Sequence, residues 1–313
     1  MTDGAQYLLI VLIVMVATAS CAQSAAECAP EDGVALQILG SGGPIADDGR
    51  ASSGYVVWVD GQSRVLIDAG GGTFLRFGES GADFTQLDFV GLSHLHTDHS
   101  ADFPALLKSG NFSTRERPLP VAGPGAGGPF PGLVSYLTSL LDPDSGAYGY
   151  LSGYLDGSGG LVRLELIEVD RERTAPVRAF RGDDGETTVD ALPVPHGIVP
   201  ALGYRVRARD VTIVFASDQN GSDLAFAVFA EGATALVMHM PIPDGAKGSA
   251  LQLHAPPARI GEIAAKASVE TLILSHFMAR SLRALETNVS VVADNYDGRI
   301  VVANDLECIN LTD

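Results

Sequence analysis

Three histidines and one aspartate fall within the short stretch "SHLHTDHS", residues 93–100. His94 and His96 are two residues apart, so at the end of an extended strand their side chains project to the same side and can share one cation. Asp98 and His99 follow as the chain turns, which directs them towards a neighbouring point. One motif therefore offers ligands for two metal ions a few ångströms apart, as a dinuclear hydrolytic centre requires.

The chain has seven histidines in all, and the four outside this motif are His196, His239, His254 and His276. Each of them follows a predicted strand or opens a predicted helix. Asp218 follows the strand-like stretch "TIVFAS", where its carboxylate could bridge two cations. A single histidine at a strand end is more often an ordinary polar residue than a ligand. Taken together, however, these residues can complete the ligand sets of two metal ions.

The elements that must position these residues fall into two β-rich halves. In the first half, predicted strands, turns and hairpins occupy residues 34–43, 54–72 and 87–92. The second half repeats the pattern over residues 162–170, 187–197, 201–218, 233–240, 269–276 and 299–305. Helical spacing is found over residues 133–141 and 256–267, and residues 144–160 predict a mobile surface loop. Two such halves with interleaved helices predict sheets packed face to face with helices outside.

Composition limits the classes of function that the chain can have. Its 313 residues are 46% hydrophobic and 19% charged, which suits one large globular domain. The formal net charge is −18, with only 20 Lys and Arg, whereas a nucleic-acid surface needs clustered cations. We therefore expect no nucleic-acid partner, and the acidity is explained by solubility.

The first residues have the pattern of a bacterial export signal. An apolar run from Tyr7 to Ala19 is too short to span a membrane and is followed by small residues. The sequence before Cys21 resembles a lipobox, so residues 1–22 predict an export signal with either lipidation at Cys21 or ordinary cleavage. The expected location is periplasmic or extracellular, with membrane attachment only through this signal or a lipid. Residues 30–313 are then expected to form one domain that carries the metal-binding motif.

Only Cys28 and Cys308 remain after that signal. In an oxidising compartment, one cysteine near each end of a domain predicts a disulfide that ties the termini together. Two unpaired thiols are the alternative.

Several segments resemble the metallo-β-lactamase superfamily, and within it the ribonuclease Z and arylsulfatase-like branch. "LGSGGP", "VLIDAGGGT", "LSHLHTDHSAD", "VPHGIVPALGYRV", "FASD" and "LILSHFMAR" occur in the order of that family. The resemblance implies an α/β fold, the four-layer αββα sandwich, with two divalent metal ions at one edge. It assigns one zinc to His94, His96 and His196, and the other to Asp98, His99 and His276, with Asp218 as the bridge. Manganese or iron would also suit such ligands.

Three further residues carry over from this resemblance. His254 matches the histidine that protonates the leaving group in ribonuclease Z, and Asp98 would orient the nucleophile as well as bind metal. His239 matches the histidine of a His-Glu-Ala-Thr stretch and is predicted to bind substrate, but Met240 occupies the glutamate position. Arg280 matches an arginine near the second metal, where its planar guanidinium could hold a phosphate or a sulfate.

The resulting prediction is an exported dinuclear-zinc hydrolase that uses a metal-bound hydroxide on small phosphodiester or aryl sulfate esters. Tyr148, Tyr150 or Tyr154 could cover the substrate. The alternative is a lactonase or β-lactamase type of acyl hydrolase from the same superfamily. A ribonuclease Z-type endoribonuclease and a metal-binding protein without turnover rank below both. The expected partner is a small anionic ester, and a homodimer is compatible with the sequence.

Overall fold

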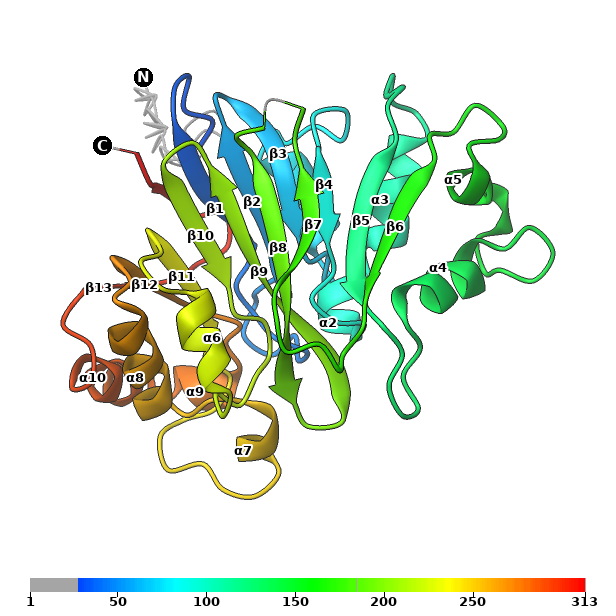
Figure 1. Ribbon diagram of the computed structural model, residues 1–313. Helices are drawn as coiled ribbons and strands as arrows, with labels where there is room; N and C mark the ends of the chain where they lie inside the picture. The colour runs from blue at the N-terminus through cyan, green and yellow to red at the C-terminus, as the bar shows by residue number, and fades with distance from the viewer. Residues whose placement is uncertain (1–27, 184, 313) are drawn as a thin grey trace, which may run out of the picture.

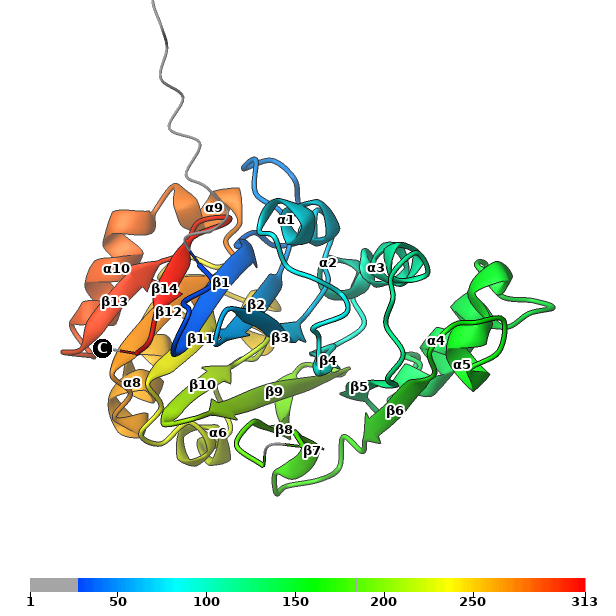
Figure 2. The same ribbon diagram turned by 90° about the horizontal axis from the view of Figure 1, so that it is seen from above.

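The computed structural model describes residues 28–183 and 185–312, so the predicted export signal at residues 1–22 lies outside the described residues. Two seven-stranded sheets pack face to face, with helices on their outer sides (Figures 1 and 2). This is the predicted αββα sandwich. Among the helices of the described ranges, none combines the length and apolar character that crossing a membrane requires.

The first sheet has the strand order β14-β1-β2-β3-β4-β5-β6. Its strands are β1 (Val34–Gly40), β2 (Gly54–Val59), β3 (Gln62–Ile67), β4 (Phe89–Gly91), β5 (Leu119–Pro124), β6 (Leu164–Val169) and β14 (Cys308–Asn310). The predicted hairpin is confirmed between β2 and β3. Asp60 and Gly61 form its tip with φ angles of 51° and 71°, the left-handed conformation that a tight two-residue hairpin turn needs.

The second sheet has the order β13-β12-β11-β10-β9-β8-β7. Its strands are β7 (Val177–Arg181), β8 (Thr188–His196), β9 (Val199–Ala208), β10 (Val211–Phe215), β11 (Ala235–His239), β12 (Thr271–Ser275) and β13 (Arg299–Val302). Strands β10, β11 and β12 are parallel, as are β3, β4 and β5 in the first sheet. The carboxyl ends of parallel strands meet at one edge, where a site can be assembled.

Helices cover the outer face of each sheet through their apolar sides. Those on the first sheet are α1 (Thr73–Glu79), α2 (Thr97–Ser100), α3 (Phe103–Gly110), α4 (Leu133–Leu141), the 3-10 turn Gly149–Leu151 and α5 (Gly153–Asp156). Those on the second are α6 (Leu224–Phe229), α8 (Pro257–Ala267) and α10 (Leu285–Ala293), with the short α7 (Ala250–Leu253) and α9 (Ala279–Leu282) near the site. Strands such as β2 are buried along their whole length because both of their faces are covered.

Residues 144–160 differ from the predicted mobile loop. They include the turn at Gly149–Leu151 and helix α5, and they pack against the first sheet's helical layer. Leu151 and Tyr154 are spaced three residues apart and are both buried, so the segment has an apolar side. The Tyr154 hydroxyl donates a hydrogen bond of 2.7 Å to the Leu107 carbonyl. Two buried side chains and this bond fix the segment.

A disulfide joins Cys28 to Cys308, in agreement with the prediction from the sequence. It closes a loop with a sequence separation of 280 residues. Strand β14 pairs antiparallel with β1, and Cys308 lies opposite Gln37 in that pairing. The bond therefore fastens the last strand and the beginning of the described chain to the same edge of the first sheet.

Candidate metal centre

Strand ends from both sheets deliver the predicted ligands to one point. Strand β4 ends at Gly91 and leads into His94, while α2 begins directly after His96 and carries Asp98 and His99. His196 is the last residue of β8. Asp218 follows β10, and His276 follows β12. All seven side chains come together at this edge, which neither half of the chain could build alone.

One group of nitrogen atoms gathers around His94. Its Nε2 lies 3.0 Å from Nδ1 of His96. The His196 ring lies 5.0 Å from that of His94 and 5.5 Å from that of His96, between ring centroids. These three histidines offer ligand atoms that are all within 4.8 Å of one another. The arrangement matches the ligand set predicted for the first metal.

A second group lies beside it. Nε2 of His99 and Nε2 of His276 are 3.1 Å apart. Oδ2 of Asp98 lies 3.2 Å from the His276 nitrogen and 3.6 Å from the His99 nitrogen. The arrangement matches the ligand set predicted for the second metal.

Asp218 lies between the two groups. Its Oδ2 is 3.7 Å from Nε2 of His196, in the first group, and 3.9 Å from Nε2 of His99, in the second. Its Oδ1 is 3.5 Å from Nε2 of His276. A carboxylate in this position can reach a cation in either group, so the geometry supports the predicted bridge.

The protonation states suit cation binding. Burial lowers the pKa of His94 well below its usual value, and burial also lowers that of His96. Burial opposes ionisation of Asp98, but the hydrogen bond from His276 and the nearby His99 hold the pKa of Asp98 below its usual range. Neutral imidazoles and ionised carboxylates are the forms that bind metal, so at neutral pH these three groups need not lose protons first, whereas His99, whose pKa is raised, must give up a proton when it binds metal.

The close pairs of ring nitrogens also fit metal ions. Two lone pairs that face each other at about 3 Å repel unless a proton or a cation lies between them. Nε2 of His196 is buried and has no hydrogen-bond partner among the described residues. A metal ion would satisfy this nitrogen and the facing pairs together. The residues present therefore fit a pair of divalent metal ions.

Asp68 was missed in the sequence as a site residue, although it directly follows β3. Its Oδ2 lies 2.7 Å from Nδ1 of His99, and its Oδ1 accepts a bond of 2.6 Å from the Ser93 backbone N–H. Burial opposes charge on His99, but Asp68 outweighs it and raises the pKa of His99 to about 9. Such a contact fixes which nitrogen of a ligating histidine faces the metal. An aspartate at a strand end, separated from a glycine run by one alanine, was the available signal.

Three residues at this edge have strained backbones. Asp68, Ser217 and His276 have φ angles of 61°, 60° and 54°, in the left-handed region that non-glycine residues seldom occupy. Each follows or nearly follows a strand, β3, β10 or β12, and each is a site residue or lies next to one. Strain of this kind concentrates where a fold must aim a side chain. The backbone therefore turns sharply at the points that direct the ligands.

His239 does not lie where a substrate-binding residue was predicted. It is buried at the end of β11, and Nδ1 lies 2.7 Å from Oδ1 of Asp218. Nε2 lies 3.2 Å from the hydroxyl of Tyr55, which also shares a 2.9 Å hydrogen bond with Ser275. Burial and the nearby His276 lower the pKa of His239 to about 3, so its ring is neutral. The structure thus places His239 behind Asp218, as a support for that carboxylate.

A cavity of about 510 Å³ opens over the two ligand groups. It is lined by Pro44, Leu95, His96, Thr97, Asp98, His196, Asp218, Leu253, His254, His276, Met278 and Arg280. Arg280 is exposed and donates from Nε to the Pro241 carbonyl at 2.8 Å, which fixes one edge of its guanidinium. None of the three tyrosines predicted to cover the substrate is among these residues. Tyr154 is instead buried under α3.

His254 lines the cavity beside Asp218. Its Nδ1 is 3.8 Å from Asp218 Oδ2 and has no hydrogen-bond partner among the described residues. Met240, at the position of the family glutamate, is buried in the apolar core under α8. Burial lowers the pKa of His254 to about 4, with the Asp218 charge opposing this. The ring is therefore neutral in the free protein and its Nδ1 is held by no glutamate.

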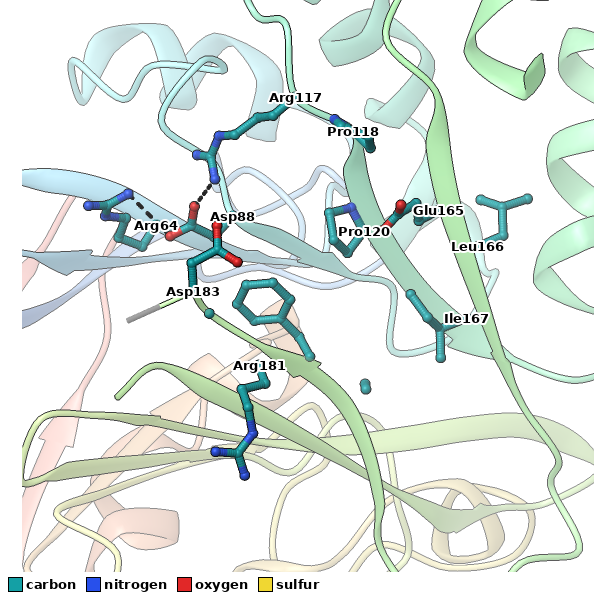
Figure 3. Close-up of a pocket in the computed structure, with 13 residues that line it drawn as sticks. Arg64, Asp88, Arg117, Pro118, Pro120, Glu165, Leu166, Ile167, Arg181 and Asp183 are labelled. Carbon is teal, nitrogen blue, oxygen red and sulfur yellow. Dashed lines mark hydrogen bonds and ion pairs between the residues drawn. The ribbon is translucent and has the colours of Figure 1, made fainter. Parts of the chain in front are cut away.

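A second cavity, of about 620 Å³, lies between the edge strands β6 and β7. Its lining includes Arg64 of β3 and Pro120 at the start of β5. The predicted metal ligands lie at the opposite end of the sandwich, where the parallel strands end. Figure 3 shows Asp88 between Arg64 and Arg117 and paired with both. No histidine or cysteine is among its lining residues. This cavity therefore has no comparable set of metal ligands.

Comparison with known proteins agrees with this geometry. The family model described as "Beta-lactamase superfamily domain" matches residues 63–277. Ribonuclease Z from Mycobacterium bovis (strain BCG / Pasteur 1173P2) is 28% identical over 289 residues, covering 88% of this chain and 98% of that protein.

Solved structures show the same fold. The short form of human tRNase Z, ELAC1, superposes with a TM-score of 0.67 at 18% identity, covering 89% of this chain and 100% of that one. A diphosphatase from the PhnP family gives a TM-score of 0.58 at 16% identity, covering 88% and 97%. Because this family model matches more than half of the chain, the chain belongs to the metallo-β-lactamase superfamily, and within it the chain is similar to ribonuclease Z.

Proposed function

We propose that this metal-dependent hydrolase cleaves small phosphodiester or aryl sulfate esters. The observation that carries the proposal is the cavity in which Arg280 and His254 share the lining with the predicted ligands of both metals. An anionic ester needs a cation for its charge, an activated water and a proton donor for the leaving group. This cavity can offer all three within about 510 Å³.

Two divalent metal ions, when bound, supply Lewis acidity and lower the pKa of a water molecule towards neutrality. Zinc suits the ligands, and manganese or iron would also do so. The residues of the chain contribute the rest. Arg280 binds the phosphate or sulfate oxygens through its terminal nitrogens, because its Nε is already bonded to the Pro241 carbonyl. Asp98 accepts a hydrogen bond from the attacking water and orients it.

His254 donates a proton to the departing oxygen. Its ring is neutral in the free protein, since burial lowers its pKa to about 4. An anionic substrate in the cavity adds negative charge next to the ring and raises that pKa. The His254 ring therefore takes up its proton from solvent when the substrate binds.

A nucleic-acid substrate is disfavoured, although the curated relative is named Ribonuclease Z. The net charge is −18, and among the described cavity-lining residues Arg280 is the one arginine or lysine. Residues 144–160 contain neither Lys nor Arg and pack against the body of the domain. A polynucleotide needs several cations along its backbone.

We also propose that the protein acts after export, in the periplasm or outside the cell. The Cys28–Cys308 disulfide supports this, because structural disulfides form and persist in oxidising compartments. Cell fractionation should find the protein in the exported fraction, and mass mapping should find its two cysteines linked. Recovery from the cytoplasmic fraction with both thiols free would contradict export.

The test of the reaction is a panel assay of the full chain after loading with zinc. The substrates are bis(p-nitrophenyl) phosphate, p-nitrophenyl sulfate, an aryl lactone, a chromogenic β-lactam and a precursor transfer RNA. We expect turnover of the phosphodiester or the sulfate that a chelator abolishes, and none with Asp98→Ala.

The other substrates decide the alternatives. Preference for the lactone or the β-lactam would indicate an acyl hydrolase, and preference for the RNA would indicate a ribonuclease. Full metal content without turnover of any substrate would favour a binding protein. Asp88→Ala, in the second cavity, is the control and should leave the activity unchanged.

A further inference from the structure

The apolar part of the lining of the metal-site cavity, called here the apolar wall, comes from four segments. Pro44 comes from the loop after β1, Leu95 from the metal motif, Leu253 from α7 and Met278 from the turn before α9. Apolar side chains next to a charged centre contribute nothing to holding metal. They are suited to burying an apolar part of a ligand, which is the common role of such walls in binding sites.

The position of Leu253 is fixed by the metal site itself. Its backbone carbonyl lies 2.9 Å from Nδ1 of His196 and so orients that ligand. Its side chain lies against Gly197, where an added Cβ would be 3.0 Å from Leu253 Cδ2. Gly197 also has a φ of 60°, which favours glycine. The chain thus leaves room beside a metal ligand for this leucine.

Exposed apolar residues adjoin the lining residues in the sequence. Ile45, Ile198 and Leu251 are 49%, 66% and 38% exposed, and each is one or two residues from a lining residue. Exposed isoleucine and leucine lose the free energy that burial would give them. Exposed apolar side chains that adjoin a binding cavity in this way can provide a surface that a ligand covers.

Charge sets a second limit on the ligand. Arg280 is the one arginine or lysine among the described residues that line the cavity. An ester with a single negative charge has a partner there, whereas a second charge further along the ligand would face the apolar wall. A charge placed against apolar side chains costs free energy unless it is paired.

We propose that the site selects singly charged esters whose second substituent is an extended apolar group, seated on Leu253, Met278 and Ile198. This inference rests on the proposed function and specifies its substrate class. The anionic centre lies against Arg280 and the ligand cluster, while the apolar group runs out along the wall.

The kinetic test uses alkyl p-nitrophenyl phosphate diesters, with chains from methyl to octyl, on the zinc-loaded full chain. The leaving group and the charge stay constant, so only the apolar contact changes. We expect kcat/KM to rise about two- to fourfold per methylene until the wall is covered. Ile198→Asn and Leu253→Asn should flatten this rise. Leu224→Asn, at a leucine of α6 that is 62% exposed, is the matched control and should keep it.

Binding gives a second readout that does not need turnover. Calorimetry of zinc-loaded protein with alkyl sulfonates from ethane to octane should show tighter binding with each added methylene, and 1,6-hexanedisulfonate should bind more weakly than hexanesulfonate. Equal affinity along the sulfonate series would overturn the inference, and so would a flat kinetic series with active methyl ester. A flat kinetic series with an active methyl ester would leave the proposed function intact. Chain-dependent sulfonate binding by a protein that cleaves neither the diesters nor p-nitrophenyl sulfate would support the inference and contradict the proposed function.

Discussion

Nδ1 of His239 lies 2.7 Å from Oδ1 of Asp218, at the point where the two predicted metal sites meet. The ring is neutral, so a proton on Nδ1 is donated to the carboxylate, and Nε2 lies 3.2 Å from the Tyr55 hydroxyl. Tyr55 belongs to β2 of the first sheet, and His239 belongs to β11 of the second. The orientation of the central carboxylate therefore depends on contact between the two halves of the fold.

Removing this support should weaken metal binding without unfolding the chain. Contacts behind metal ligands are worth about 10- to 100-fold in metal affinity. We expect Tyr55→Phe to fall at the low end of that range and His239→Ala at the high end, as measured by competition with a chromogenic chelator. Tyr154→Phe removes another buried hydroxyl, one bonded to the Leu107 carbonyl. Unchanged affinity in His239→Ala, or an equal loss in Tyr154→Phe, would contradict the supporting role.

Asp218 should matter to both metals at once. Its oxygens face His196 in one group and His99 and His276 in the other. We expect Asp218→Ala to lose both metal ions, while His94→Ala should lose chiefly one. Metal content per chain, by elemental analysis after dialysis, checks this. An Asp218→Ala protein that keeps both ions would show that the carboxylate is no bridge.

The role of His254 should depend on the leaving group. An alkoxide must be protonated as it departs, whereas a nitrophenolate leaves without help. His254→Ala should therefore slow alkyl esters by about 10²- to 10⁴-fold and leave nitrophenyl esters nearly unchanged. The ratio of kcat values for the two substrate types is the measurement, made at equal metal content. Equal losses on both would mean that His254 binds the substrate and donates no proton.

Much of this centre could be predicted because its ligands are close in sequence or mark strand ends. His94, His96, Asp98 and His99 lie in one motif, and the chain's other histidines are few. The αββα fold followed from the resemblance, and the Asp60-Gly61 turn from local chemistry. Such features depend on spacing and on turn conformation, both of which can be read directly from residues.

The supporting contacts could not be predicted in the same way. Tyr55 reaches His239 across 184 positions of sequence, and nothing local in "GYVVWV" distinguishes this tyrosine from a core residue. The sequence predicts a substrate contact for His239 because it shows the order of strand ends but not which side of Asp218 each side chain occupies. The 144–160 segment was predicted to be mobile from its glycines, whereas Leu151 and Tyr154 hold it in place. Tertiary packing decided each of these outcomes.

The disulfide should contribute to stability through the unfolded state. Closing so long a loop reduces the conformational entropy of the unfolded chain. In practice this stabilises the folded state by about 2–4 kcal/mol. We expect a Cys28→Ser, Cys308→Ser double variant to lose that much free energy of unfolding in urea. The reduced wild-type protein is the control and should match the variant. Equal stability of the oxidised protein and the variant would show that the bond adds nothing.

Asp190 of β8 should make the stability depend on acidity. It is 5% exposed, and Arg178 and Arg205 donate to it at 2.5 and 2.9 Å, with Arg207 at 3.4 Å. Burial opposes its ionisation, but the arginines outweigh burial and lower the pKa of Asp190 below its usual value. A carboxylate with a lowered pKa in the folded state stabilises that state above its unfolded pKa of about 4, and this contribution is lost as the pH falls through the folded pKa.

Asp190→Asn should therefore lose about 1–3 kcal/mol of unfolding free energy at pH 7, because three arginines lose their charged partner. The difference between wild type and variant should shrink as the pH is lowered below about 4, where the wild-type carboxylate takes up its proton. Urea unfolding at a series of pH values measures this difference. Asp294→Asn, at an exposed carboxylate ending α10, serves as the control and should show little difference at any pH. A gap between wild type and Asp190→Asn that stays constant or widens towards low pH would mean that the arginines do not stabilise the charged form.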